Sequence, residues 1–274
     1  MARSKSGEPL LVDTHAHLAF PEYDGDRDEV IARALAAGIW QVCVGTSRET
    51  SRAAIALAER HGEGVFATVG VYPGDAADPG GDPAEEEGES AAVRELARHP
   101  KVVAIGECGL DLKGVGEGER RAVLGAQRCR LEWQIEIARE LGKPLVLHCR
   151  DAYPELIAAL AARPLTRAEG SGVAHFFSGT IEDAELLLDL GYDFSFGGVI
   201  TFTRDYDELV AYLPLNRLLA ETDAPFVAPA SHRGRRNEPL YLREIVRRLA
   251  ELKGLTEGEV ARQTTENARR LFGI

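Results

Sequence analysis

The sequence has no long hydrophobic run, and this absence excludes several classes of protein. No uninterrupted apolar segment approaches the roughly 18 residues that cross a bilayer, so we expect no membrane-spanning helix. Residues 1–10, MARSKSGEPL, include neither the apolar core nor the cleavage site of a secretory signal. We therefore expect residues 1–8 to form a disordered lead and the protein to be cytoplasmic.

Cysteine is also scarce, and its spacing excludes two further classes. The chain has four cysteines with no CxxC pair among them: Cys43, Cys108, Cys129 and Cys149. A zinc ribbon or a disulfide framework needs closer, paired spacing. Without an export signal, we expect these residues to be reduced thiols buried in the core.

Positive charge is in deficit, because 32 lysines and arginines face 44 acidic residues and leave a formal net charge of −12. Proteins that coat nucleic acid depend on lysine and arginine to neutralise phosphates, so this class is disfavoured. A local site for a charged substrate is still compatible with the composition, since metal ions in an acidic pocket can supply positive charge.

What the chain does contain is a regular alternation of short apolar runs and longer segments of helical periodicity. The predicted strands are 10–16, 40–45, 65–71, 102–108, 144–149, 172–177, 192–200 and 217–223. The predicted helices are 26–38, 51–62, 89–100, 119–142, 152–164, 181–191, 205–214 and 239–254. Eight such units in about 250 residues are typical of a TIM-type (β/α)8 barrel. An open doubly wound sheet is the alternative, because local patterns do not prove closure.

The rest of the chain fits one domain, residues 9–274. Residues 255–274 have the pattern of an additional amphipathic helix, so we expect a distorted (β/α)8 barrel with one extra C-terminal helix. Residues 74–90 are rich in proline, glycine and acids, which predicts a solvated loop.

Six titratable side chains fall near the ends of predicted strands: His15, His17, Glu107, His148, His175 and Asp223. Active sites of such barrels lie at the carboxyl ends of the strands, so we expect these side chains on one rim. Each one alone has a structural explanation, as a hydrogen-bonded histidine or half of an ion pair. Six together would be underpaired without a compensating ion.

The spacing of His15 and His17 supports a metal site. Residues two apart on a strand face the same way, so both imidazoles can hold one ion. Asp13 has the same parity and is expected either to orient a ligand or to be a buried acid bonded to a neighbouring strand. Imidazole and carboxylate ligands suit Zn, Mn, Fe, Ni or Co, and Mg less well. Six ligands exceed the usual set of one catalytic zinc, which favours two divalent ions.

Seven motifs occur in order along almost the entire chain: DTHAHL, AIGECGLD, LVLHCRDA, HFFSG, ETDAPF, RGRRNEPLYL and TENARRLFG. Together they resemble the TatD metal-dependent deoxyribonucleases of the amidohydrolase-like superfamily. The resemblance implies a two-metal site in which His15, His17 and Asp223 hold one ion. Glu107 would bridge to a second ion, which His148 and His175 complete.

The sequence departs from that family at two places. The family often carries histidines in the motif VGVYPGD, where this chain has Tyr72 and Gly74, and an aromatic residue at the position of Leu112. We expect both places to lie near the substrate and to affect substrate preference and rate more than metal binding.

The predicted function is a divalent-metal-dependent hydrolase, a TatD-like deoxyribonuclease that trims single strands of DNA by a metal-activated water. Asp223 is the expected acceptor of the water's proton, with a role as ligand only as the alternative, and Glu107 is the expected bridging carboxylate. An amide, ester or lactone hydrolase using the same site is the second reading. A binding protein with vestigial metals is the third.

Arg150 is expected to contact the substrate, because the planar arginine fork suits phosphate. The resemblance implies further substrate contacts at Tyr72 and at Arg233 or Arg236, or both. The structural alternatives are an ion pair of Arg150 with Asp151 and a solvated basic loop around the other two arginines. Glu221 should lie deeper in the barrel and make a structural contact. No protein partner is predicted.

Overall fold

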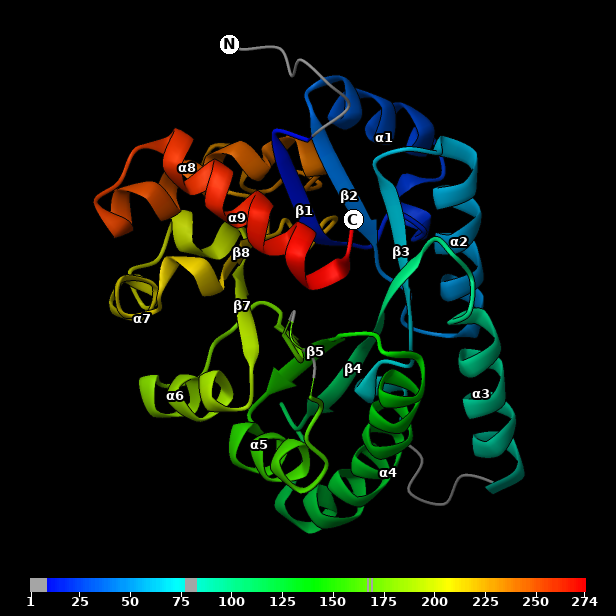
Figure 1. Cartoon of the computed structure of the whole chain (residues 1–274). Helices are drawn as coiled ribbons and strands as arrows, with labels where there is room; N and C mark the ends of the chain where they lie inside the picture. Colours follow the sequence, from blue (N-terminus) through cyan, green and yellow to red (C-terminus); the bar gives the residue numbers. More distant parts are fainter. Residues whose placement is uncertain (1–8, 77–82, 167, 169) are drawn as a thin grey trace.

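The computed structural model describes residues 9–76, 83–166, 168 and 170–274, so the expected disordered lead lies outside the described residues (Figure 1). Eight parallel strands pair in sequence order in a single sheet. The strands are β1 Leu11–Ala16, β2 Ile39–Cys43, β3 Val65–Val69, β4 Val102–Asp111, β5 Leu145–Arg150, β6 Gly172–Ala174, β7 Tyr192–Phe196 and β8 Leu218–Ala220.

The sheet closes between its first and last strands. Ala16 of β1 forms a parallel bridge with Ala224, just after β8. The backbone N–H of His17 donates to Ala224 O at 2.7 Å, and that of Asp223 donates to His15 O at 2.9 Å. The barrel prediction is therefore confirmed and the open sheet is excluded.

A helix follows every strand, as the periodicity predicts. These helices are α1 Arg27–Ala36, α2 Arg48–His61, α3 Pro83–Leu96, α4 Glu117–Leu141, α5 Tyr153–Ala162, α6 Ile181–Asp189, α7 Asp207–Tyr212 and α8 Leu242–Lys253. Short 3-10 turns are η1 Pro21–Tyr23, η2 Pro73–Ala76, η3 Gly198–Thr201, η4 Leu215–Arg217, η5 Ala230–His232 and η6 Pro239–Tyr241. The expected extra C-terminal helix is present as α9, Glu257–Phe272.

The expected loop over 74–90 is partly wrong, because α3 begins at residue 83, while residues 77–82 lie outside the described part of the chain. Glu85 and Glu86 occupy the first helical turn, where negative charge is favoured by the helix dipole. Glu86 also accepts hydrogen bonds from Arg130 and Trp133 of α4. An acidic run with fixed partners forms helix where composition alone predicts a loop.

Two hydrophobic clusters surround and fill the barrel. The larger one packs the outer face of the strands against the helices and includes Cys43, Cys108 and Cys149. The fourth cysteine, Cys129, is exposed, which corrects the expectation that all four are buried. The smaller cluster joins one valine or leucine from most strands to the end of α9, which packs against β1 and β8 (Figure 1). The amino ends of the strands are thus closed by α9, which leaves the carboxyl ends for a site.

No helix in the described part of the chain is long and apolar enough to cross a membrane. The longest of them, α4, carries charged residues along its whole length. The cytoplasmic location stays a prediction.

Candidate metal centre

The six expected ligand residues meet at the carboxyl ends of the strands. Five of them line a cavity of about 600 Å³, and His15 is fully buried beside them. They come from β1, β4 and β5 and from the residues just after β1, β6 and β8: His15, Glu107, His148, His17, His175 and Asp223. Asp223 adopts a left-handed backbone with φ of 54°, which residues other than glycine rarely adopt.

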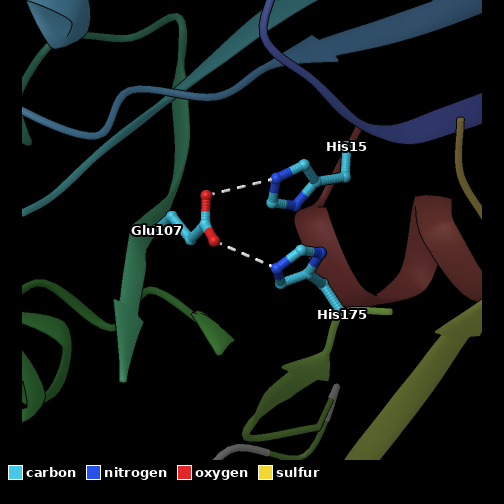
Figure 2. A group of neighbouring side chains, drawn as sticks. All are labelled: His15, Glu107 and His175. Atoms are coloured by element: carbon cyan, nitrogen blue, oxygen red, sulfur yellow. Dashed lines mark hydrogen bonds and ion pairs between the residues drawn. The ribbon is translucent and has the colours of Figure 1, made fainter. Parts of the chain in front are cut away.

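Glu107 divides its two carboxylate oxygens between two pairs of histidines, and Figure 2 shows one histidine of each pair, His15 and His175. Its Oε2 atom lies 3.4 Å from His15 Nε2 and 3.5 Å from His17 Nε2. Its Oε1 atom lies 2.9 Å from His148 Nδ1 and 3.0 Å from His175 Nε2. Each oxygen of this one carboxylate therefore faces its own pair of histidine nitrogens, and the two pairs adjoin where the rings of His15 and His175 stack with centroids 3.9 Å apart.

Each set has the shape of a small ligand cluster. In the first, His15 Nε2 and His17 Nε2 lie 3.1 Å apart, and Asp223 Oδ1 lies 3.8 Å and 3.4 Å from them. In the second, His148 Nδ1 lies 3.3 Å from His175 Nε2. The ligand atoms of His15, His17 and Asp223 all lie within 4.8 Å of one another, as do those of His15, Glu107 and His175.

The chemistry of this donor set fits divalent metal ions. Two imidazole nitrogens at 3.1 Å from each other cannot both carry a proton without a clash. The other nitrogen, Nδ1, of both His15 and His17 is buried without a hydrogen-bond partner among the described residues. Converging imidazole and carboxylate ligands of this kind are typical of zinc, manganese, iron, nickel and cobalt sites.

Two carboxylates hold the histidines of the second set from behind. Asp111 Oδ2 lies 3.1 Å from His148 Nε2 and accepts a hydrogen bond from the Tyr72 hydroxyl at 2.8 Å. Glu221 Oε1 lies 3.4 Å from His175 Nδ1. Carboxylates in this position orient metal-binding imidazoles and raise their basicity.

Asp111 is a functional candidate that the sequence reasoning missed, although its motif is recognised. The predicted strand ends at residue 108, whereas β4 continues to Asp111. With the longer strand, Glu107 and Asp111 share one face, while Cys108 and Leu110 between them are buried in the outer core. Strand parity would have identified Asp111 had the strand end been correct.

Glu221 makes a structural contact deep in the barrel, as predicted, and it also positions His175. Its Oε1 atom accepts a hydrogen bond from the backbone N–H of Phe176 at 2.8 Å, and Oε2 accepts one from the hydroxyl of Ser195. These bonds fix the carboxylate next to His175.

Of the two roles expected for Asp13, the structure shows the buried acid bonded to a neighbouring segment. The register between β1 and β2 shifts after Asp13, which interrupts the alternation that would place it beside His15. The carboxylate of Asp13 instead accepts hydrogen bonds from Thr222 N at 2.9 Å and Thr222 Oγ1 at 2.6 Å. It is a buried acid that ties β1 to the segment after β8.

The electrostatics of the metal-free cluster are dominated by burial and by Glu107. Burial, with the nearby charge of His175, lowers the pKa of His15 to about 4, so this ring is neutral at pH 7. Burial also opposes charge on His175, but Glu107 and Glu221 outweigh it and raise the pKa of His175 well above its usual value. Burial acts against ionised Glu107 as well, yet the positive charge of His175 and hydrogen bonds from histidines hold its pKa well below the usual range.

Asp111 is ionised in the same way. Burial would raise its pKa, but hydrogen bonds with His148 and Tyr72 outweigh that effect and lower it to about 2. Asp111 and Glu107 in turn raise the pKa of His148 against the opposing effect of burial.

The four expected substrate contacts separate into two groups. Tyr72 and Arg150 line the cavity, whereas Arg233 and Arg236 are not among its lining residues. The side chain of Arg150 is exposed and forms no ion pair with a described residue, Asp151 included. It is the one lysine or arginine in the described lining.

The two arginines outside the cavity have different surroundings. Arg236 donates to both carboxylate oxygens of Asp26 at 2.6 Å and to Glu22 O at 2.7 Å, and its guanidinium lies over the ring of Tyr23. Arg233 lies 3.9 Å above the centroid of the exposed Phe202 ring. The guanidinium of Arg236 is thus fully engaged within the fold, and that of Arg233 is open to solvent.

Tyr72 and Gly74, the two residues that differ from the family motif in VGVYPGD, depend on each other sterically. A Cβ atom at position 74 would lie 2.4 Å from the ring of Tyr72, so the ring occupies the space that a side chain at 74 would need. Leu112 is only 2% exposed and packs in the core, so the expectation that it lies near the substrate is wrong.

A closed parallel barrel with histidines and carboxylates converging at its carboxyl rim defines a metal-dependent hydrolase of the barrel type. The family described as TatD related DNase matches residues 12–273, and the chain belongs to this family.

Individual relatives agree with this assignment. An uncharacterised metal-dependent hydrolase, YabD of Bacillus subtilis, is 38% identical over 97% of this chain and 100% of its own length. The 3'-5' ssDNA/RNA exonuclease TatD of Erwinia tasmaniensis is 37% identical over 96% of this chain and 100% of its own. Among solved structures, YJJV, a TatD homologue from Escherichia coli, superposes with a TM-score of 0.84 at 31% identity and covers 97% of this chain and 98% of that one.

Proposed function

We propose that this protein is a divalent-metal-dependent nuclease that hydrolyses phosphodiester bonds at the ends of single-stranded DNA. The observation that carries the proposal is the division of the Glu107 carboxylate between two histidine clusters. A shared carboxylate is what a pair of neighbouring ions requires, and such pairs suit displacement at phosphorus. The relative named as an exonuclease for single-stranded DNA and RNA supports the substrate class.

In this proposal His15, His17 and Asp223 would hold one ion and His148 and His175 the other, with Glu107 available to both. Bound divalent ions would lower the pKa of a water molecule and polarise a phosphoryl oxygen. Which of Zn, Mn, Mg, Ni, Fe or Co is native is left to metal analysis.

The protein's own groups then position substrate and accept the proton. Asp223 lines the cavity with its Oδ1 atom 3.4 Å from His17 Nε2, and we assign to it the proton of the attacking water. Arg150 reaches the same cavity from β5 and is free to bind a phosphate with its planar fork. Tyr72, held by Asp111, presents its ring beside His148 with centroids 4.9 Å apart.

The experiment that tests the proposal measures cleavage of an end-labelled single-stranded oligonucleotide. The metal-loaded protein should shorten the strand, and prior removal of metal with a chelator should abolish cleavage until metal is restored. His148→Ala should abolish it permanently, while Arg94→Ala, which removes an exposed ion pair between α3 and α4, should not. Cleavage that survives both chelation and His148→Ala would exclude the proposed site.

The second candidate is an amide, ester or lactone hydrolase with the same metal centre. The observation that favours it is the scarcity of cations in the cavity, where Arg150 stands alone among the described lining residues. Rates on nucleotide diesters, measured beside a panel of lactones and amides, separate the two. A nuclease should lose most of its diester activity in Arg150→Ala and show little turnover of the lactones.

A further inference from the structure

We propose that Phe226 is a stacking platform for an unpaired nucleobase next to the bond that is cleaved. The inference rests on the proposed nuclease function and assigns a residue to its substrate specificity. Phe226 lines the cavity and is 43% exposed, although it is a large hydrophobic side chain. An exposed aromatic ring inside a catalytic cavity has a free face that a ligand can cover.

The ring is held close to the metal centre. The backbone N–H of Phe226 donates to Asp223 O at 2.9 Å. This bond closes a tight turn, which keeps Phe226 close to Asp223, a proposed metal ligand. Its centroid lies 5.8 Å from that of His17 and 6.2 Å from that of Phe20, both in edge-to-face arrangements. Phe20 in turn stacks on His17 with centroids 4.6 Å apart. Phe226 is therefore held by two aromatic neighbours while 43% of it stays exposed.

The backbone around the ring is fixed before any substrate arrives. The buried Asn237 side chain donates to Phe226 O at 2.7 Å and to Thr222 O at 2.8 Å. A platform that is already rigid loses little conformational freedom when a ligand binds, which increases the net contribution of stacking.

Phe226 and Arg150, the cation among the described lining residues, lie on opposite sides of the cavity. Phe20, Phe226 and Val227 follow β1 and β8, which are adjacent in the closed barrel. Arg150 lies on β5, four strands from β1 in the sheet order, and so on the other side of the barrel. A nucleotide has the same division, with an apolar base face and an anionic phosphate. A base against Phe226 leaves its phosphate directed toward the metal centre and Arg150.

This arrangement selects an unpaired base. Inside a duplex both faces of a base are covered by its neighbours, and a terminal base is still paired to the opposite strand, so a base must be unpaired before it can enter the cavity and stack on Phe226. Stacking on an aromatic side chain is also tolerant of base identity, because every base has a π-face. The proposal therefore predicts preference for single strands with little sequence preference.

Binding to an oligothymidylate with hydrolysis-resistant phosphorothioate linkages tests the proposal on the metal-loaded protein. A matched strand with abasic residues at its terminal positions removes only the bases. Phe226→Ala should weaken binding of the intact strand by roughly 5- to 100-fold, the range for loss of one stacked base. The same variant should bind the abasic strand as the wild type does, and Phe226→Tyr should restore tight binding of the intact strand.

A control variant removes an exposed apolar side chain elsewhere. Leu186→Ala on α6, where the side chain is 51% exposed outside the cavity lining, should change neither affinity. Equal losses on intact and abasic strands in Phe226→Ala would overturn the proposal, as would no loss at all.

Failure of the proposed function has a different signature. If the wild-type protein cleaves no unmodified strand but turns over lactones or amides, the nuclease assignment fails. If it cleaves strands and Phe226→Ala binds and cleaves equally well, only the stacking platform fails.

Discussion

His15 Nε2 and His17 Nε2 lie 3.1 Å apart and face the same carboxylate, Glu107, with no hydrogen-bond partner for the other nitrogen of either ring among the described residues. Burial lowers the pKa of His15 to about 4, so its ring is neutral at pH 7 and carries one proton, on one of its two nitrogens. Two imidazole nitrogens that lie this close to each other and face one carboxylate are arranged to share a cation.

Asp111→Asn should weaken binding of the ion held by His148. The change removes the charge that lies 3.1 Å from His148 Nε2 and orients the ring. Loss of such a carboxylate typically lowers metal affinity by about 10- to 100-fold. Competition with a chromogenic chelator measures the change. Tyr72→Phe, which removes only the hydroxyl that donates to Asp111, is the matched control and should shift affinity far less. Equal affinities in wild type and Asp111→Asn would contradict the role of Asp111.

Metal binding should release protons at neutral pH. In the metal-free protein burial disfavours charge on His175, but Glu107 and Glu221 outweigh it and raise the pKa of His175 well above its usual value. A group with a raised pKa is protonated below that pKa, so metal and proton compete as the pH falls, and the competition disappears once the pH exceeds it. His15, with a pKa of about 4, adds no proton.

The raised pKa of His175 also predicts how the stability of the metal-free protein changes with pH. The charged form of His175 stabilises the fold fully below its unfolded pKa of about 6.5, and this contribution is lost as the pH rises through the raised folded value. Chemical denaturation of the metal-free protein across this pH range measures that loss. For the release of protons on metal binding, calorimetric titration with metal at pH 7 in buffers of different ionisation enthalpy counts the protons, and a binding enthalpy that is independent of the buffer would contradict that release.

Arg233→Ala and Arg236→Ala should behave differently. Arg233 is open to solvent over Phe202, so its loss should weaken binding of a single strand and reduce the dependence of log affinity on log salt by about 0.7 if it contacts one phosphate. Arg236 is tied to Asp26 and Glu22, so its loss should lower the free energy of unfolding by about 1 kcal/mol and leave the salt dependence unchanged. Salt titrations of affinity and chemical denaturation measure the two effects. A reduced salt slope in Arg236→Ala would reverse our placement of these residues.

The barrel and the metal centre can be predicted from the sequence because both depend on local sequence patterns, namely strand ends and helical periodicity. Each strand end places its polar residue on the same rim, so His148 and Asp223 are recognisable although they are 75 positions apart in the sequence. Periodicity likewise predicts α9, whose apolar face contacts the barrel.

The errors arise where a local rule is overridden by three-dimensional contacts. Asp13 breaks the expected parity because β1 shifts register, and Asp111 is missed because β4 is longer than its apolar run. The contact between Arg236 and Asp26 joins residues 210 positions apart, which no local pattern reveals. The coupling of Tyr72 and Gly74 is visible only once the ring is placed.

Anomalous scattering from crystals of the manganese-loaded protein tests the central claim most directly. We predict two ions per chain on opposite sides of Glu107, one within reach of His15, His17 and Asp223 and the other within reach of His148 and His175. Ions that bind away from Glu107, or a single ion that saturates the site without contacting its carboxylate, would contradict the shared-carboxylate centre.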